Sequence, residues 1–185
     1  MGDPKKQRKK YATPRHPWRR DQLDVELRLM GEYGLRNKRE LWRYKTMLSE
    51  MRGIARSLLA KSGAEREKSE RDFLSRLRRM GLAGDTTSID DTLDLDIRDL
   101  LERRLQTVVL RGGLAGSASQ SRQLISHGHI TVSGRVVTVP GYLVAKADDE
   151  GVRYAAESPI AKSDHPARQS LKGQPAEPAS PVHSS

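Results

Sequence analysis

The sequence contains no cysteine and has few hydrophobic residues for its length of 185 residues. The absence of cysteine excludes disulfides and thiolate metal sites, and it fits an intracellular protein. Because only 35% of the residues are hydrophobic, we expect a modest core and segments that do not fold alone. No apolar run approaches the length of a transmembrane helix, and no apolar stretch follows the basic N-terminus as in a secretory signal. A membrane-spanning or secreted protein is therefore not expected.

Positive charge is what the sequence has in excess, with a formal net charge of +10 and an isoelectric point of about 10.1. Such an excess suits a polyanion, most often nucleic acid, with a membrane surface as the rival. Residues 1–20 hold eight Lys or Arg residues against Asp3 alone, interleaved with Tyr11, Pro14 and Trp18. Aromatic and proline residues among cations suit an arm that lies along a phosphate backbone and orders on binding, rather than a solvated tail. We therefore predict a basic RNA-binding arm over residues 1–20.

Residues 21–96 predict a helical domain that ends in an acidic linker. The first helix is expected to bury a stripe of Leu23, Leu27 and Met30 and to end at Gly31 or Gly34. Val25 and Leu29 blur the period, so a strand is the alternative. Asn37 and Glu40 form a capping pair that opens a second helix. Its apolar residues recur at alternating steps of three and four: Leu41, Tyr44, Leu48, Met51, Ala55 and Leu58. A third helix is expected from about Ala64 to Met80, with Phe73, Leu77 and Met80 on its apolar stripe.

Four arginines lie off the apolar stripe of the second helix in two i,i+4 pairs: Arg39 with Arg43, and Arg52 with Arg56. Like charges at this spacing repel each other by a few tenths of a kcal/mol per pair. An anionic partner would relieve the repulsion, whereas an ordinary solvated face is the alternative. The pattern favours an anionic partner along this helix, and the solvated face stays open because Glu40 and Glu50 lie nearby.

Residues 81–97 contain five aspartates and no Lys or Arg. Paired carboxylates can serve acid–base chemistry or bind a metal. The spacing matches no calcium loop, and no His, Lys or Ser constellation accompanies the acids. We therefore interpret the segment as a linker that ends in a helix cap, with Asp96 paired to Asp99 three residues on.

The rhythm of the sequence changes again after residue 97. A helix is expected from about Ile97 to Arg111, and a shorter one opens at Gly116-Ser117. The inner face of the shorter helix is expected to hold two small residues and two larger ones: Ala118, Ser121, Leu124 and Ile125. Strand-like alternation then starts at Ile130, a Ser133-Gly134 turn follows, and a strand from Arg135 to Val139 returns. The outer face of the short helix and the hairpin turn would hold polar and basic groups at a fixed spacing, which suits recognition of RNA shape.

The stretch "LERRLQTVVLRGGLAGSASQSRQLISHGHITVSGRVV", Leu101 to Val137, resembles the RNA-binding module named after ribosomal protein S-four. The stretch "GEYGLRNKRELWR", Gly31 to Arg43, resembles the start of the helical domain of the S-four family in its archaeal and eukaryotic form. Two positions depart from the module pattern. Ser133 stands where Asn is usual before the turn glycine, and Ala118 stands where many members carry Arg.

The resemblance implies a mostly helical α+β fold, in which two helices pack on a short antiparallel hairpin sheet. The expected segments are the arm (1–20), a helical domain with an acidic linker (21–96), the module (97–157) and a disordered tail (158–185). Within the module, Asp148 to Glu150 are expected to form a hairpin turn with Gly151 and to lead into a last strand.

The resemblance also implies a structural constituent of the small ribosomal subunit in the cytoplasm. Such a protein binds small-subunit ribosomal RNA early in assembly and contributes to translational accuracy. Its implied neighbours are the S-five and S-twelve families and messenger RNA where it enters. No enzymatic activity, cofactor, metal or membrane is expected. The alternatives are an RNA-modifying enzyme of the pseudouridine-synthase type, for which the chain leaves no room, and a free regulatory RNA-binding protein.

The residues expected to contact RNA are cations of the arm and helical domain and the polar surface of the module. They are Lys9, Lys10, Arg19, Arg20, Arg36, Lys38, Arg39, Arg43, Arg52, Arg56, Arg104, Gly116, Ser117, Ser119, Gln120, Arg122, Gln123, Ser126, His127, Gly128, Thr131, Ser133, Gly134 and Arg135. His127 and His129 are interpreted as turn and packing residues rather than metal ligands, because no third ligand lies near them in sequence.

Overall fold

The computed structural model describes residues 9–84 and 86–162, together with residues 165, 166 and 168. The chain divides into two compact units, with the division between Arg103 and Arg104. This lies a short way beyond the boundary expected between residues 96 and 97, and the four expected segments stay a prediction. No helix within the described residues is long and apolar enough to cross a membrane.

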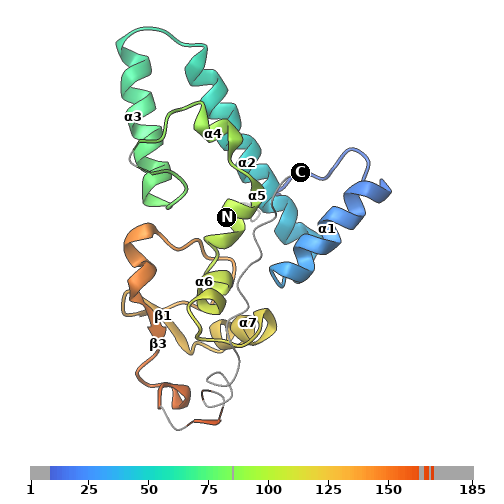
Figure 1. Cartoon of the computed structure of the whole chain (residues 1–185), viewed down its shortest axis with the longest axis vertical. Coiled ribbons are helices and arrows are strands. Elements are labelled where there is room, and N and C mark those ends of the chain that lie inside the picture. The colour runs from blue at the N-terminus through green and yellow to red at the C-terminus, as the bar shows by residue number, and fades with distance from the viewer. Residues whose placement is uncertain (1–8, 85, 163–164, 167, 169–185) are drawn as a thin grey trace, which may run out of the picture. The chain divides into compact units, whose positions relative to one another are not determined.

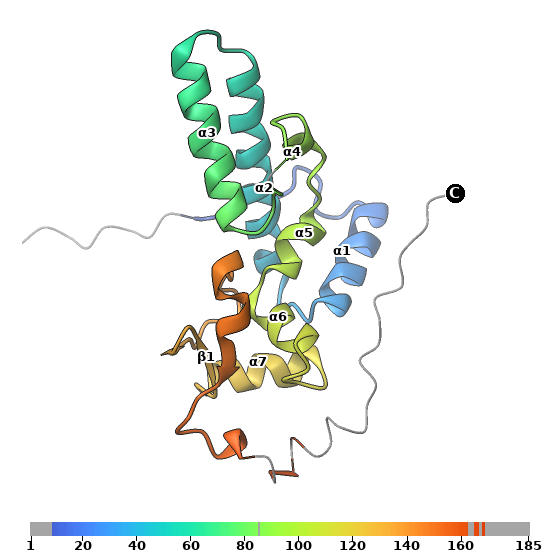
Figure 2. The ribbon, with the colours of Figure 1, turned by 60° about the vertical axis from the view of Figure 1, so that its left-hand side comes forward.

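Helices make up the first unit (Figure 1). The first three are α1 (Arg20–Glu32), α2 (Lys38–Leu59) and α3 (Ala64–Arg79). The chain turns back after α2, so that α2 and α3 lie side by side in Figure 1 and Figure 2. Two short helices, α4 (Asp91–Asp94) and α5 (Ile97–Glu102), pack against α2. The long α2 is therefore the central element of this unit.

The predictions for α2 are confirmed. Asn37 is extended, and its side chain accepts a hydrogen bond of 3.0 Å from the backbone N–H of Glu40, which caps the helix. The buried residues of α2 are the predicted stripe: Leu41, Tyr44, Leu48, Met51, Ala55 and Leu58. A helix with one continuous apolar stripe can be buried along one side only, so its sequence alone determines which residues face the core.

The stripe predicted for α1 is wrong at Leu27, whereas Leu23 and Met30 are half-buried. Leu27 is 56% exposed, and the helix buries Glu26 and Leu29 instead. The physical reason is that side chains of α2 hydrogen-bond the Glu26 carboxylate, which turns this face of α1 inward. The helix ends at Glu32, and Gly34 follows with φ 57°, a left-handed conformation that glycine adopts readily.

The third helix and the cap at the end of the acidic segment follow the predictions, but the segment is not a simple linker, because it forms α4 and buries Thr92. Phe73 and Leu77 of α3 are buried, while Met80 at its end is half-buried. Asp96 and Asp99 form a reciprocal capping box at the start of α5, with 2.7 Å between the Asp96 nitrogen and the Asp99 carboxylate. The predicted linker residue Asp85 lies outside the described residues. Among those that are described, no group of three or more His, Cys, Asp or Glu could hold a metal.

The helix predicted from Ile97 to Arg111 is wrong, since it is broken into α5 and α6 (Leu105–Arg111). Arg104 is extended and forms an isolated β-bridge with Leu143. In addition, the Leu105 N–H donates to the Tyr142 carbonyl over 2.7 Å. The backbone groups at the break are thus satisfied by a distant segment, which local sequence periodicity cannot reveal.

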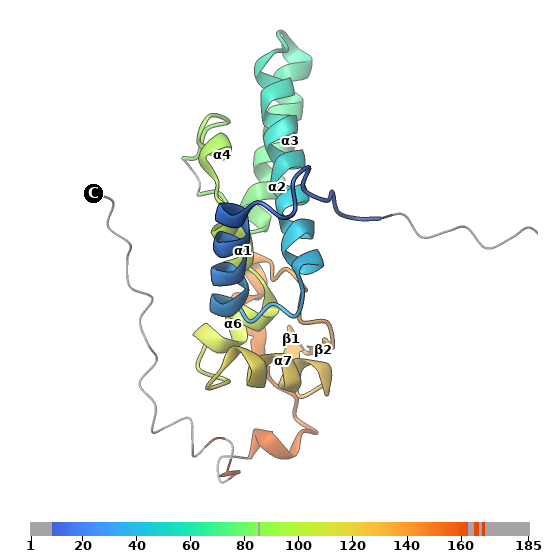
Figure 3. The ribbon, with the colours of Figure 1, turned by 90° about the vertical axis from the view of Figure 1, so that its right-hand side faces the viewer.

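The second unit packs two helices on a small antiparallel sheet (Figure 3). Helix α7 (Ala118–Ser126) lies against α6, and the sheet order is β2-β1-β3. The strands are β1 (Ile130–Val132), β2 (Arg135–Val136) and β3 (Val152–Tyr154). A buried core joins them: Leu105, Val109, Ala115, Leu124, Ile125, Ile130, Val132 and Val144. The mostly helical α+β fold is therefore confirmed.

Two details of the sheet differ from the predictions. The returning strand β2 is shorter than the expected residues 135–139. The acidic residues expected in a hairpin turn lie in a 3-10 helix, η1 (Lys146–Gly151), and β3 pairs with β1 rather than with the preceding strand. The long segment after β2 carries the chain across to the other side of β1, so no tight turn is needed.

The first residues of the predicted tail pack against the sheet. Ser158 is 8% exposed, and its hydroxyl lies 2.9 Å from Nδ1 of His129. A short 3-10 helix, η2 (Pro159–Ala161), follows, and Ile160 packs on the core. The rest of the predicted tail, apart from residues 162, 165, 166 and 168, lies outside the described residues.

Candidate nucleic-acid interface

The outer face of α7 begins with a braced turn. Ser117 caps the helix, since its Oγ accepts a hydrogen bond of 3.1 Å from the Gln120 N–H. The Gln120 side chain in turn accepts from the Gly116 N–H over 2.7 Å. These two bonds hold three predicted contact residues, Gly116, Ser117 and Gln120, in one geometry. Further along the same face, Ser119, Gln123 and Ser126 are exposed.

The inner face of α7 lies close to α6 because it carries small residues. The Ser121 hydroxyl donates to the Gln106 carbonyl over 2.7 Å, and Ser121 is fully buried. The Gln106 amide donates to the Ala118 carbonyl over 2.9 Å. Sequence reasoning missed Gln106. The only signal for it was a polar pair, Gln106 and Thr107, between the apolar residues of the segment 105–110.

Gln106 also contacts two of the predicted RNA-binding arginines. Its Oε1 lies 3.4 Å from Nη1 of Arg122 and 3.4 Å from Nη2 of Arg104. Arg122 is half-buried, so its guanidinium is oriented while part of it reaches solvent. Arg104 is fully buried. In this structure Arg104 therefore contributes to the core of its unit and is not exposed to RNA.

The hairpin turn between β1 and β2 has the geometry that the Ser-Gly pair predicts. Ser133 has φ 48° and Gly134 φ 80°, as a two-residue type I′ turn requires. Ser133 is the only described residue other than glycine with a positive φ. Its hydroxyl bonds the Asp148 carboxylate, and its N–H donates to the Gly151 carbonyl over 3.0 Å. Two contacts to η1 thus hold the turn, and exposed Arg135 follows directly.

The segment between α7 and β1 is also fixed. Gly128 has φ 77°, and the exposed His127 forms the C-cap of α7. The rings of His127 and His129 lie 6.3 Å apart between centroids. His129 contacts Ser158, as expected for a packing residue. Thr131 donates through Oγ1 to a carbonyl of β3 over 3.2 Å, so its hydroxyl is already used within the sheet.

The basic residues of α2 fall into two groups. Arg39, Arg43 and Arg56 are exposed. Arg52, by contrast, donates through Nη2 to the Leu95 carbonyl over 2.6 Å. Because this bond joins α2 to the segment before α5, Arg52 has a structural role in this unit. Lys38 lies 3.4 Å from the buried Glu26 carboxylate, which gives it a structural partner too.

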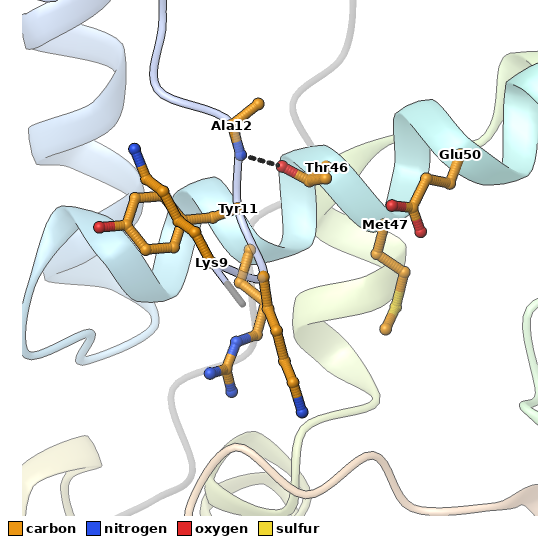
Figure 4. Close-up of a pocket in the computed structure, with 8 residues that line it drawn as sticks. Lys9, Tyr11, Ala12, Thr46, Met47 and Glu50 are labelled. Atoms are coloured by element: carbon orange, nitrogen blue, oxygen red, sulfur yellow. Dashed lines mark hydrogen bonds between the residues drawn. The ribbon is translucent and has the colours of Figure 1, made fainter. Parts of the chain in front are cut away.

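The described part of the arm lies against α2 (Figure 4). The Ala12 N–H donates to Oγ1 of Thr46 over 2.9 Å, and the rings of Tyr11 and Trp42 lie 6.0 Å apart. Sequence reasoning missed Thr46 and Trp42 as anchors. Only their position on the polar side of α2 could have indicated them. The remaining predicted cations of this unit are exposed: Lys9, Lys10, Arg19, Arg20 and Arg36.

Comparison with known proteins agrees with this geometry. Residues 103–150 match the S4 domain family. The chain is 52% identical over 162 residues to small ribosomal subunit protein uS4 of Ignicoccus hospitalis, covering 88% of this chain and 98% of that protein. The protein of the same name from Thermoplasma volcanium is 49% identical, covering 92% and 87%. The one from Picrophilus torridus is 46% identical, covering 94% and 96%.

Proposed function

Since the chain belongs to the family of small ribosomal subunit protein uS4, we propose that it is a structural component of the small ribosomal subunit in the cytoplasm. In this role it binds small-subunit ribosomal RNA directly. The observation that carries the proposal is the 52% identity that spans 88% of this chain and 98% of a relative bearing that name. The match includes both units and not only the RNA-binding module.

The mechanism of binding is geometric. The outer face of α7 carries short polar side chains, which let the helix approach a sugar–phosphate backbone closely. Arg122 offers a guanidinium that can pair with phosphate in two parallel hydrogen bonds, and Arg135 presents a second cation from the braced hairpin. Because both elements are rigid, their donors fit one RNA shape better than another.

Membership of this family also leads us to propose more specific features of the role. The protein takes part in subunit assembly and translational accuracy, and it catalyses no reaction. Its neighbours are the S-five and S-twelve families, and messenger RNA passes near it. Support for the non-catalytic role is that the three relatives carry the name of a ribosomal protein.

The test is co-sedimentation of the tagged chain with small ribosomal subunits after a high-salt wash. We expect the chain to remain with the subunits, and the double variant Arg122→Ala/Arg135→Ala to be washed off more readily. The matched control is Lys68→Ala/Arg71→Ala, because Lys68 and Arg71 are two exposed cations on α3 outside the proposed surface. A chain found only in the free fraction would contradict the ribosomal role and favour a regulatory protein that acts off the ribosome.

A further inference from the structure

A cavity of about 540 Å³ lies between the arm and α2, lined by side chains of both. In Figure 4 the side chains of Met47 and Glu50 lie on one side of the arm backbone, and those of Lys9 and Tyr11 on the other. The volume is in the range that small organic ligands occupy in proteins. The cavity is therefore large enough for one nucleotide.

The arm wall of this cavity is fixed in place. Thr46 accepts from the Ala12 N–H and donates its own hydroxyl to the Trp42 carbonyl over 2.8 Å. Tyr11 lies against Trp42, and Nζ of Lys9 lies 4.6 Å from the Tyr11 ring centroid. Lys9 also donates to Thr13 over 2.8 Å. Because these contacts hold the wall, the cavity is already formed before a ligand binds.

The charges around the cavity are arranged for a ligand with two different ends. Lys10 and Arg43 are exposed cations, and Glu50 is an exposed carboxylate on the same helix as Arg43. Within the described part of the chain none of the three forms an ion pair or a hydrogen bond through its side chain. Met47, which is half-buried, adds an apolar surface next to Glu50.

Resting on the proposed function, we propose that this cavity binds one unpaired guanine nucleotide of the RNA. Lys10 and Arg43 hold its phosphate as charge-assisted donors. The base lies on Met47 and faces Glu50. A carboxylate has two acceptor oxygens and no donor, so it pairs with a base edge that offers two adjacent donors. Guanine offers such an edge through its N1–H and its exocyclic amino group, whereas uracil has a single N–H.

A site for phosphate alone does not account for Glu50. Its negative charge opposes a bare anion, so a purely electrostatic cradle would leave it out. The Glu50 carboxylate next to the apolar Met47 suits a ligand that also has a flat ring with hydrogen-bond donors at its edge. For this reason the occupant is a nucleotide with a readable base rather than any passing segment of backbone.

The test measures the affinity of the full chain for labelled five-nucleotide RNAs by fluorescence anisotropy at one fixed salt concentration. The probes are five uridines and the same strand with guanosine or inosine at its centre. We expect the guanosine strand to bind about fivefold more tightly than the uridine strand, the low end of what a good paired base contact provides. Inosine keeps N1–H but lacks the amino group, so it should lose most of this preference.

Two variants with matched controls assign the preference to the cavity. Glu50→Gln should abolish the guanosine preference, whereas Glu65→Gln, an exposed glutamate at the start of α3, should retain it. Arg43→Ala should weaken binding of the guanosine strand more than Arg56→Ala does, since Arg56 does not line the cavity. Equal binding of all three strands, or a preference that survives Glu50→Gln, would overturn the assignment. If the chain then still co-sediments with small subunits, the proposed function stands without it, whereas a chain that binds no RNA at all overturns both.

Discussion

Glu26 is a carboxylate in the interior of the first unit, with 1% of its surface exposed. Four side chains surround it. Nζ of Lys45 lies 2.8 Å away, Nε1 of Trp42 3.2 Å and Nε2 of Gln22 3.1 Å, and Lys38 is 3.4 Å from its second oxygen. Burial raises the pKa of Glu26, but the hydrogen bonds from Lys45, Gln22 and Trp42 outweigh it and bring the pKa below its ordinary value of 4.5.

This lowered pKa predicts a contribution to acid unfolding. A carboxyl with a lower pKa in the folded state stabilises the fold fully above pH 4.5, and the contribution is lost as the pH falls through the folded-state pKa. Glu26→Gln should lower the free energy of unfolding at pH 7 by about 1–3 kcal/mol. It should also make stability less sensitive to pH below 4.5. Urea unfolding followed by tryptophan fluorescence, in steps from pH 7 to pH 3, measures both effects. An equally steep loss in variant and wild type would contradict the assignment.

Arg122 and Leu124 separate RNA recognition from folding within α7. Arg122→Ala should weaken RNA binding by about 1–3 kcal/mol, because it removes a charge-assisted contact to phosphate. Its effect on the melting temperature should be small, since its guanidinium is half-exposed and 3.4 Å from its partner on Gln106. Leu124 is 7% exposed in the core of the second unit. Leu124→Ala should therefore cost about 2–5 kcal/mol of stability.

The measurement is a pair, thermal unfolding and RNA affinity for both variants at one salt concentration. At temperatures where Leu124→Ala is folded, its affinity for RNA should match that of the wild type. A melting temperature lowered as much by Arg122→Ala as by Leu124→Ala would show that Arg122 is chiefly a structural residue. Arg122 would then no longer count as an RNA contact on the outer face of α7.

At the scale of elements, the sequence predicted a helix well where the residues that determine its cap and its buried face lie within or next to that helix. The stripe and cap of α2 were predictable because the apolar spacing and the Asn37–Glu40 pair are local. The orientation of α1 was not, because it depends on a buried Glu26 whose partners come from α2. The break before α6 likewise depends on pairing between Arg104 and the distant Leu143.

The candidate site shows the same division. Residue types and the hairpin turn could be predicted from the stretch between residues 116 and 135. What the sequence could not show is which polar groups already have partners. Arg104 and Arg122 converge on Gln106, and Ser133 is bonded to Asp148. The contacts of Arg122 and Ser133 join residues on different elements, so they follow only from the fold.

The close contact between η1 and the hairpin turn leads to a prediction about Gly151. A Cβ at this position would lie 2.8 Å from Oγ and 3.0 Å from the backbone nitrogen of Ser133. Gly151→Ala should therefore push η1 away from the turn and destabilise the second unit by about 1–3 kcal/mol. Gly31→Ala is the control, because a Cβ there meets nothing within 4 Å and Gly31 lies inside α1. That change should stabilise the protein by about 0.5–1 kcal/mol.

Thermal unfolding of both glycine variants measures these opposite shifts. The Gly151 variant should also bind RNA more weakly, since Arg135 follows the displaced turn directly. An unchanged melting temperature for Gly151→Ala would show that η1 can move without loss, and that the turn does not need it for support.

At the scale of the whole molecule, the positively charged side chains differ in whether they already have partners within the protein. Some cations already have partners inside the protein: Lys38, Lys45, Arg52 and Arg104. Others are exposed on the arm, along α2 and at the hairpin: Lys9, Lys10, Arg39, Arg43, Arg56 and Arg135. These exposed cations, together with the half-buried Arg122, can neutralise phosphates and release counterions when RNA binds. The salt dependence of RNA affinity therefore depends on how many cations contact phosphates and not on the net charge of the protein.

We expect the logarithm of RNA affinity to fall steeply with the logarithm of salt concentration, by about 0.7–0.9 for each phosphate neutralised. Replacing Lys9, Lys10 and Arg43 by Gln should reduce the magnitude of this slope by about 1.4–1.8, because two phosphate contacts are lost: the one that Lys10 and Arg43 share and the one that Lys9 makes. The control replaces Lys61, Lys68 and Arg71, three exposed cations outside the proposed surface, with the same change in net charge. It should leave the slope unchanged. Titration of each variant with small-subunit RNA at several salt concentrations measures the slopes. Equal slopes for both triple variants would mean that net charge alone attracts the RNA, and that the arm and α2 form no defined contact surface.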